Sequence, residues 1–438
     1  MSYQPVDVIE VSAWGERVGA VALDPTTSVY AFEYTPEWIA SGIELAPLHM
    51  PLRSGVFEFP ELSRETFLGL PAMLADALPD KFGNAVVDAW MAEQGLSTDR
   101  ITALDRLAYA ADRAMGALEF RPPMRDTSTE EPTAVVLADL VVAARRALTG
   151  ELSGHHAAHD ALAQLVTVGT SAGGARAKAV LAFNPTTWQV RSAHADMPEG
   201  FEHWLIKLDG VSGSVGLDGH GDRLGESAPY GRIEYAYYLM ATGAGIEMAD
   251  CRLLAEGPRR HFMTRRFDRE AGGRRHHLMS LCAMAHLDFN LTGVHSYDQY
   301  LETVRRLGLS PNQIAQAYRR MVFNVSAVNR DDHTKNLAFL LPERGRWQLA
   351  PAFDVTHAYR PDSPWTSKHL MSVNGRFDEI ALSDLHAVAE RHDVPGYKRI
   401  IREVADAIDR WPHYAEQAEL DAVVTAEIAK DMDRFRPS

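Results

Sequence analysis

The sequence has few cysteines and no excess of positive charge. Only Cys251 and Cys282 occur among its 438 residues, which excludes a disulfide framework or a cysteine-rich zinc module and fits a reducing compartment. The 44 Lys and Arg residues are outnumbered by 59 Asp and Glu residues, giving a net charge of −15. This balance argues against a nucleic-acid-binding protein, because neutralising phosphates requires a basic excess on at least one face. A local basic patch is still compatible with it.

Long apolar runs and targeting signals are also missing. No apolar run approaches the roughly 18 residues that a membrane-spanning helix requires, and the start MSYQPVDVIEV has no basic region followed by an apolar one. We therefore expect no signal peptide, no membrane anchor and a cytoplasmic location. With 46% hydrophobic and 24% charged residues, the chain has a globular composition, and its length predicts two or three domains.

The residue patterns predict β-rich segments first and a mostly helical segment last. The polar, proline-containing stretch from Arg121 to Thr133 indicates a domain boundary. Strands are expected at 6–14, 16–23, 28–34, 165–169, 179–183 and 203–208, and a hairpin at 337–341 and 346–350. Helices are expected at 67–94, about 135–148, from about 230, 297–307, 311–328, 382–391 and 397–410.

The strongest chemical signal is the segment NRDDHTKN at 329–336, followed by the hairpin and Asp354. Asp331 and Asn336 have the D-x-x-x-x-N spacing of a kinase catalytic loop, in which the Asp accepts the substrate hydroxyl proton and the Asn binds magnesium. Asn336 precedes the first hairpin strand and Asp354 follows the second, so antiparallel pairing brings together two oxygen ligands for a hard cation. Asp332 is a competing base, and Asp331 is preferred because it alone has the five-residue offset to Asn336.

The segment TSAGGARAK at 170–178, between two expected strands, is a weaker signal. Gly and Ala let the backbone approach phosphates, and Arg176 or Lys178 can supply positive charge. The segment matches neither G-x-G-x-x-G nor a Walker A loop. By itself, a plain hairpin turn is the simpler interpretation.

Lys207 lies in the apolar strand HWLIKL. A kinase places its phosphate-contacting lysine on such a strand, with a helical carboxylate nearby to orient it. The alternative is an edge-strand lysine that favours solubility. Glu234 is the expected ion-pair partner of Lys207, and Glu226 stays open as a second candidate.

Together, these segments resemble the HipA family of bacterial toxin kinases, over nearly the whole chain. The segments that carry the resemblance are WGERVG at 14–19, LPD at 78–80, GALEF at 116–120, SAGGARAK at 171–178, IKL at 206–208, RFDR at 266–269, DDHTKN at 331–336 and FD at 353–354. The resemblance implies an α+β, protein-kinase-related fold. Its expected parts are a β-rich N-terminal subdomain at 1–125, an N lobe with the nucleotide loop at 126–267 and a mostly helical C lobe at 268–438.

The resemblance also implies roles for individual residues. Asp331 is expected to be the catalytic base, Asn336 and Asp354 the magnesium ligands, and Ser171 the autophosphorylated serine, whose modification is associated with an ejected loop and loss of activity. The residues expected to contact ATP are Gly173, Gly174, Ala175, Arg176, Ala177, Lys178, Lys207, Arg265, Arg266, Phe267, His333, Thr334, Lys335, Asn336, Phe353 and Asp354.

The implied activity is the ATP- and Mg²⁺-dependent phosphorylation of serine or threonine in a protein. Such kinases are usually encoded with a HipB-like DNA-binding antitoxin, so we expect contact with nucleic acid only through that partner. Known targets in the family include aminoacyl-tRNA synthetases. The alternatives are a pseudokinase that acts by binding its antitoxin and a small-molecule phosphotransferase. The combination of Lys207, Asp331, Asn336 and Asp354 argues against the pseudokinase.

Overall fold

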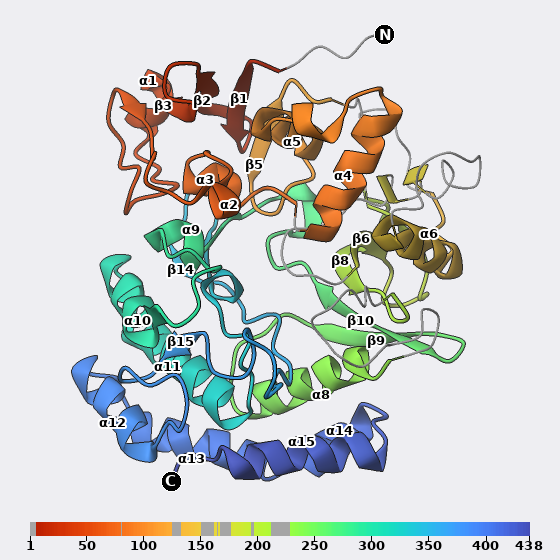
Figure 1. Ribbon diagram of the computed structural model, residues 1–438, viewed down its shortest axis with the longest axis vertical. Helices are drawn as coiled ribbons and strands as arrows, with labels where there is room; N and C mark the ends of the chain where they lie inside the picture. The colour runs from red at the N-terminus through yellow and green to blue at the C-terminus, as the bar shows by residue number, and fades with distance from the viewer. Residues whose placement is uncertain are drawn as a thin grey trace.

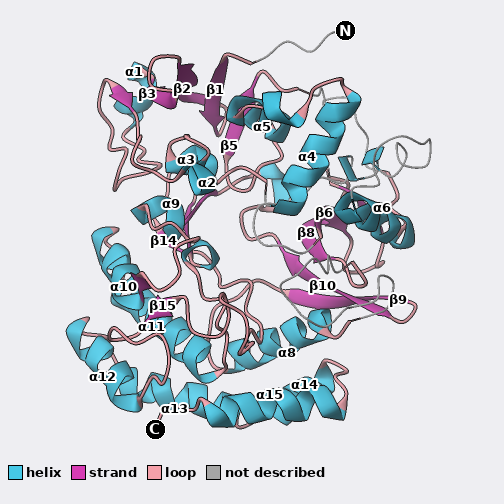
Figure 2. Ribbon diagram, in the orientation of Figure 1, coloured by secondary structure: helices cyan, strands magenta, loops and turns pink. Residues whose placement is uncertain are grey.

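The computed structural model describes residues 6–79, 81–124, 133–149, 162–163, 165–166, 177–193, 197–211 and 228–438. Within these residues, two five-stranded sheets precede a mainly helical region, so the expected α+β class is confirmed. In Figure 1 the N-terminal sheet lies at the top, the second sheet at the right and the C-terminal helices at the bottom. Figure 2 shows how strongly helices dominate the lower part of the molecule.

The first sheet is antiparallel, with the strand order β4-β3-β2-β1-β5. Its strands are β1 (Val8–Ala13), β2 (Glu16–Asp24), β3 (Val29–Tyr34), β4 (Val56–Phe57) and β5 (Leu118–Arg121). The turn between β1 and β2 is Trp14-Gly15, with φ values of 54° and 79°. A two-residue hairpin favours this left-handed backbone because it matches the twist of the strands. The three strands expected before residue 35 are confirmed.

The helix expected at 67–94 is wrong as a continuous element. Three helices replace it: α2 (Arg64–Phe67), α3 (Ala72–Ala75) and α4 (Lys81–Glu93). Pro71 and Pro79 lie in the two gaps. Proline lacks the backbone N–H and disfavours helical backbone in the residue before it, so each proline interrupts the periodic pattern. The other helices of this region are α1 (Pro36–Ser41), η1 (Thr98–Arg100) and α5 (Ala103–Ala110).

The second sheet is also antiparallel, in the order β7-β6-β8-β10-β9. Its strands are β6 (Lys178–Phe183), β7 (Val190–Ser192), β8 (Glu202–Lys207), β9 (Cys251–Glu256) and β10 (Arg259–Arg265). Helices α6 (Leu137–Thr149) and α4 share its apolar core, in which Phe82, Leu140 and Ile206 are buried. The strands expected at 179–183 and 203–208 are confirmed. Because β8 is the central strand, Lys207 is not an edge-strand lysine.

The strand expected at 165–169 is wrong where the structure describes it. Leu165 and Val166 are helical and buried in the same core as α6. A short apolar run does not by itself distinguish a strand from a buried piece of helix, and here packing decides for the helix. The remainder of that segment, 167–169, lies outside the described residues.

The last part of the chain is mainly helical. Its helices are α8 (Tyr230–Gly243), α9 (Leu281–Ala285), α10 (Tyr297–Arg306), α11 (Pro311–Ser326), α12 (Leu382–Arg391), α13 (Tyr397–Ile408), α14 (Trp411–Gln417) and α15 (Ala422–Arg434), with short η2 (Ala271–Gly273) and η3 (Thr334–Asn336). Its strands are β11 (His277–Ser280), β12 (His295–Ser296), β13 (Ala338–Leu341), β14 (Gln348–Leu349) and β15 (Met371–Ser372). The helices and hairpin expected here are confirmed. None of the helices in the described ranges is long and apolar enough to span a bilayer.

The N-terminal sheet and the helical region share one buried core. Phe32 of β3, Met279 of β11 and Tyr297 of α10 belong to the same cluster, and α3 contacts α9 directly. The division of the chain into 1–125, 126–267 and 268–438 stays a prediction.

Candidate active site

A pocket lies where the second sheet, α8 and the β13–β14 hairpin meet. Many of the residues expected to contact ATP line it. The lining residues are Asp76, Met115, Lys178, Leu205, Lys207, Glu234, Met248, Cys251, Phe262, Thr264, Arg265, Arg266, Phe267, Leu278, Ser280, Lys335, Asn336, Ala338, Phe353, Asp354 and Val355. Residues that are distant in the sequence, from Asp76 to Val355, thus line one cavity.

The remaining expected ATP contacts divide into two groups. Ala177, His333 and Thr334 belong to the described chain but not to this lining. Thr334 is buried and donates to the Leu287 carbonyl at 2.7 Å, while His333 Nδ1 accepts from the Lys335 N–H at 3.2 Å and caps η3. Gly173, Gly174, Ala175 and Arg176, together with Ser171, lie outside the described residues.

Lys207 forms the expected ion pair with Glu234. Lys207 Nζ lies 2.5 Å from Glu234 Oε1, and Glu226 lies outside the described residues. Helix α8 brings Glu234 this close because Gly231 lets it approach β10: a Cβ at Gly231 would lie 2.6 Å from the Arg260 carbonyl oxygen. Burial by itself lowers the pKa of Lys207, but the charges of Asp354 and Glu234 outweigh burial and raise that pKa. The ammonium therefore stays protonated.

Asp354 is the second anionic partner of Lys207. Its Oδ1 accepts a short hydrogen bond from Lys207 Nζ, and its Oδ2 lies 3.9 Å from Lys178 Nζ. The two lysines are opposite each other in the β6–β8 register, so the pairing places both ammonium groups beside one carboxylate. Burial raises the pKa of Asp354, yet Lys207 and Lys178 reverse this effect and hold the pKa well below its ordinary value. Asp354 is therefore ionised.

Asn336 and Asp354 flank the expected hairpin and line the same pocket. In the hairpin, Phe339 pairs with Leu349 and Leu340 with Gln348. The side chain of Asn336 donates from Nδ2 to the Asp331 carbonyl at 2.9 Å. This bond links Asn336 to the catalytic-loop candidate Asp331 and leaves the amide oxygen of Asn336 to act as a ligand.

The two adjacent aspartates of the loop have different environments. Asp332 is buried and accepts from the Leu370 N–H at 2.8 Å and the Tyr297 hydroxyl at 2.8 Å, while His369 Nδ1 lies 2.9 Å from its Oδ2. The Asp331 side chain is 35% exposed. Asp332 is therefore held inside the protein, whereas a substrate can reach Asp331.

Two pocket residues from the N-terminal region were not anticipated, Asp76 and Met115. Asp76 accepts from the Ser280 N–H at 2.6 Å and from the Ser280 hydroxyl at 2.8 Å. Ser280 is the N-cap of α9, so Asp76 joins the N-terminal region to the start of that helix. Sequence patterns gave no signal for this contact, because it joins residues 204 positions apart.

The segment Arg265–Phe267 begins with the last residue of β10 and lies at the edge of the pocket. The N–H of Arg265 donates to the Asp250 carbonyl and the N–H of Arg266 to the His203 carbonyl, both at 2.8 Å. The Phe267 ring lies 5.8 Å from that of Phe353 with an interplanar angle of 32°. The two rings supply an aromatic wall to the pocket.

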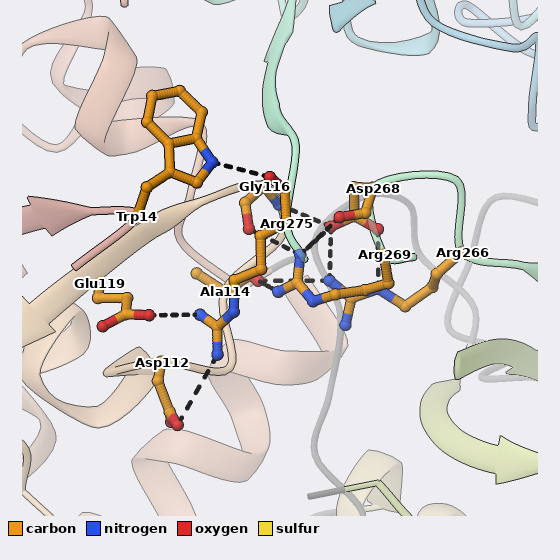
Figure 3. Close-up of polar contacts among 9 residues, drawn as sticks. All are labelled: Trp14, Asp112, Ala114, Gly116, Glu119, Arg266, Asp268, Arg269 and Arg275. Atoms are coloured by element: carbon orange, nitrogen blue, oxygen red, sulfur yellow. Dashed lines mark hydrogen bonds and ion pairs between the residues drawn. The ribbon is translucent and has the colours of Figure 1, made fainter. Parts of the chain in front are cut away.

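Immediately after this segment, Asp268 anchors the N-terminal region (Figure 3). Its carboxylate accepts from Arg266 at 2.6 and 3.0 Å, from Arg269 at 2.7 Å and from the Gly116 N–H at 2.8 Å. Arg269 in turn donates to the carbonyls of Gly116 and Ala114 at 2.7 and 2.9 Å. Although burial raises the pKa of Asp268, the two guanidinium groups lower it well below its ordinary value.

A second set of contacts in Figure 3 strengthens the same junction. The Trp14 indole N–H donates to the Arg275 carbonyl at 2.8 Å, and Arg275 Nη1 lies 3.1 Å from Glu119 Oε1. Both partners of Arg275 belong to the N-terminal sheet region. Hydrogen bonds and ion pairs thus connect the edge of the pocket to the N-terminal sheet at several residues.

Comparison with known structures identifies the fold. The chain of a Shewanella oneidensis MR-1 complex of HipA, HipB and operator DNA matches with a TM-score of 0.67 and 16% identity, covering 98% of this chain and 97% of that one. A Helicobacter pylori proinflammatory kinase, CtkA, matches with a TM-score of 0.35 and 13% identity, over 53% of this chain and 86% of that one. No curated protein matches the sequence.

Two family models match the sequence itself. Residues 9–121 match the HipA N-terminal domain, and residues 170–411 match the HipA-like C-terminal domain. The second match alone spans more than half of the 438 residues. The chain therefore belongs to the HipA family.

Proposed function

We propose that this chain is an ATP- and magnesium-dependent protein kinase that phosphorylates serine or threonine hydroxyls. The observation that carries the proposal is the contact of Lys207 with both Glu234 and Asp354 inside a pocket that Asn336 also lines. Phosphoryl transfer needs little covalent chemistry from a protein. It depends on a lysine that neutralises phosphate charge, a carboxylate that orients this lysine, and oxygen ligands for a divalent cation.

ATP would lie along the length of this pocket. Phe267 and Phe353 offer apolar surfaces to the purine, and Lys178 and Lys207 face the position of the phosphates. The N–H groups of Arg265 and Arg266 already donate within the protein, so we assign polar recognition of the purine to the carbonyl oxygens of this segment and to the Phe267 backbone. The resemblance to the family assigns the nucleotide loop to Gly173 to Lys178, of which residues 173–176 lie outside the described residues.

The residues present fit magnesium. Asp354 offers a carboxylate and Asn336 an amide oxygen, and both are hard donors. Among the described residues no group of three His, Cys, Asp or Glu side chains is placed to hold a metal. Magnesium suits a site with few protein ligands because substrate phosphates and water complete its coordination. When bound, it would neutralise charge on the transferred phosphoryl group.

Asp331 is assigned as the base that orients the substrate hydroxyl and accepts its proton. The assignment is supported by its exposed carboxylate and by the link from its carbonyl to Asn336. Asp332 is unsuited to this role because three protein groups surround its carboxylate.

Three details of the proposal, the modified serine, the partner and the substrate, rest on membership of the HipA family. We propose autophosphorylation at Ser171, a HipB-like antitoxin as partner, and a translation-related protein such as an aminoacyl-tRNA synthetase as substrate. The S. oneidensis structure, which holds HipA together with HipB and operator DNA, supports the antitoxin. The net charge of −15 agrees with DNA contact that is made through such a partner.

The test is incubation of purified chain with labelled ATP and magnesium in host lysate, with phosphorylation sites mapped by mass spectrometry. Transfer to Ser or Thr that is lost in Asp331→Asn supports the kinase. ATP binding without transfer to any protein would favour a pseudokinase that acts by binding its antitoxin. Transfer to small molecules alone would favour a metabolite phosphotransferase.

A further inference from the structure

The loop that follows Asp354 returns to the catalytic loop at Trp365. The indole Nε1–H of Trp365 donates to Asp331 Oδ1 at 2.6 Å, across 34 positions of sequence. His333 Nε2 lies 3.7 Å from the same oxygen. The contacts of the Asp331 carboxylate within the described chain thus use Oδ1, and the other oxygen is available to a substrate hydroxyl.

The indole is itself held in place. The hydroxyl of Ser363, a residue only 9% exposed, accepts from the N–H groups of Trp365 and Thr366, both at 3.2 Å. The ring packs edge-on against His333, at 5.9 Å and 61°, and against Phe289, at 6.5 Å and 83°. The direction of the indole N–H is therefore set by a turn behind the ring and by two rings beside it.

We propose that Trp365 is a positioning residue for Asp331, an inference that rests on the proposed kinase function. The indole N–H fixes Oδ1, the Asn336 amide fixes the Asp331 carbonyl, and together they aim Oδ2 at the acceptor hydroxyl. A carboxylate that rotates about its side-chain bonds spends less time in a reactive geometry, and such misplacement slows transfer without weakening substrate binding.

The number of donors is consistent with this role. Asp332, next in sequence, is surrounded by Tyr297, His369 and the Leu370 N–H and is buried. Asp331 receives one strong hydrogen bond, from the edge of a large ring, and is still 35% exposed. One donor orients a carboxylate while leaving lone pairs for the substrate.

The test replaces Trp365 with Phe, which keeps an aromatic ring and removes the N–H. The matched control is Trp347→Phe, because Trp347 also donates an indole hydrogen bond, to the Glu44 carbonyl at 3.0 Å, but lies outside the pocket lining. Three quantities are measured for both variants and for wild type. They are the single-turnover rate of phosphoryl transfer from ATP to a pool of Ser- and Thr-containing peptides, the ATP dissociation constant and the melting temperature.

We expect Trp365→Phe to lower the transfer rate about tenfold, with ATP affinity and melting temperature equal to those of Trp347→Phe. In an Asp331→Asn background, Trp365→Phe should cause no further loss, because a residue that acts through Asp331 has nothing left to position. A wild-type rate in Trp365→Phe overturns the inference. So does a parallel fall in ATP affinity or melting temperature, which would make Trp365 a structural residue.

The same series separates this inference from the function on which it rests. If wild type transfers no phosphate, the proposed function fails and the positioning role fails with it. If wild type transfers phosphate and Asp331→Asn does so at the same rate, the kinase stands, but the base assignment fails and the positioning role fails with it. If Asp331→Asn is inactive while Trp365→Phe is fully active, only the positioning role is wrong.

Discussion

Asp354 and Asp268 are both carboxylates between two cationic side chains, but they are held in different ways. Asp354 faces Lys207 and Lys178 at the pocket, and its side chain is 21% exposed. Asp268 is fully buried between Arg266 and Arg269, and it also accepts from the Gly116 N–H. Both have a pKa held well below the ordinary value.

The difference lies in the cations. Arg266 and Arg269 bind Asp268 through planar guanidinium groups that also contact backbone carbonyls of the N-terminal region, so every partner is fixed. A lysine ammonium is a compact charge on a flexible stem and exchanges partners readily. A low carboxylate pKa therefore does not by itself identify a functional group, and what distinguishes Asp354 is a cavity on its other side.

The largest expected effect is on stability, in Asp268→Ala. Removing this carboxylate leaves two buried guanidinium groups without their counter-charge, and breaking such a buried pair costs about 3–5 kcal/mol. Thermal unfolding followed by circular dichroism should show a marked fall in melting temperature. The control is Glu270→Ala, which removes the exposed partner of Arg274 and His276 and should cost at most about 1 kcal/mol. Equal melting temperatures for the two variants would contradict the architectural role of Asp268.

Asp354→Asn should lower catalytic activity more than stability, in contrast to Asp268→Ala. We expect phosphoryl transfer to fall roughly 10²–10³-fold, equivalent to about 3–4 kcal/mol, because the proposed magnesium site loses its carboxylate ligand. The melting temperature should fall less than in Asp268→Ala, since Lys207 keeps its ion pair with Glu234. Transfer assays over a series of magnesium concentrations, alongside thermal unfolding, measure both. A variant that unfolds early but transfers at the normal rate would show that Asp354 is structural.

The adjacent residues Asp331 and Asp332 should also differ, with one needed for activity and the other for stability, but with smaller effects. Asp331→Asn should bind ATP and melt as wild type does, but transfer phosphate roughly 100-fold more slowly. Asp332→Asn should instead lower the melting temperature, because an amide NH₂ now faces buried donors, at a cost of about 1–3 kcal/mol. Nucleotide titration, single-turnover assays and thermal unfolding distinguish the two. If the two phenotypes are interchanged, the base has been assigned to the wrong residue.

The effect that is smallest at each measured step is a pH dependence near the Asp268 cluster. Burial, with the charges of Arg266 and Arg269, lowers the pKa of His203 to about 4 from an ordinary 6.5. As pH falls from 6.5 to 4, the unfolded chain protonates this residue before the folded chain does, so stability declines by at most about 1.4 kcal/mol per pH unit. In His203→Gln, melting temperatures over this range should fall less steeply than in wild type. The exposed His413→Gln serves as the control, and identical slopes in all three proteins would refute the prediction.

The sequence by itself determined most of the helices and strands and indicated a candidate catalytic loop at 331–336. Alternating apolar residues and turn residues act over a few positions, so the N-terminal strands and the later helices were predictable from local patterns. The sequence also predicted that Asn336 and Asp354 lie together, because a hairpin brings the residue before its first strand close to the residue after its second, and both line the pocket. The catalytic and metal-binding roles of Asp331, Asn336 and Asp354 stay predictions. The helix expected at 67–94 is three shorter helices, because Pro71 and Pro79 interrupt helical backbone that the apolar spacing alone would continue.

Only the tertiary structure decided which distant residues meet. Lys207 and Asp354 are 147 positions apart, and Asp76 and Ser280 are 204 apart. No local pattern encodes such pairs, because they depend on how the second sheet, α8 and the N-terminal region pack against the C-terminal hairpin. The environments of Asp331 and Asp332 differ for the same reason: of these two neighbours of identical chemistry, the packed core buries Asp332 and leaves Asp331 partly exposed.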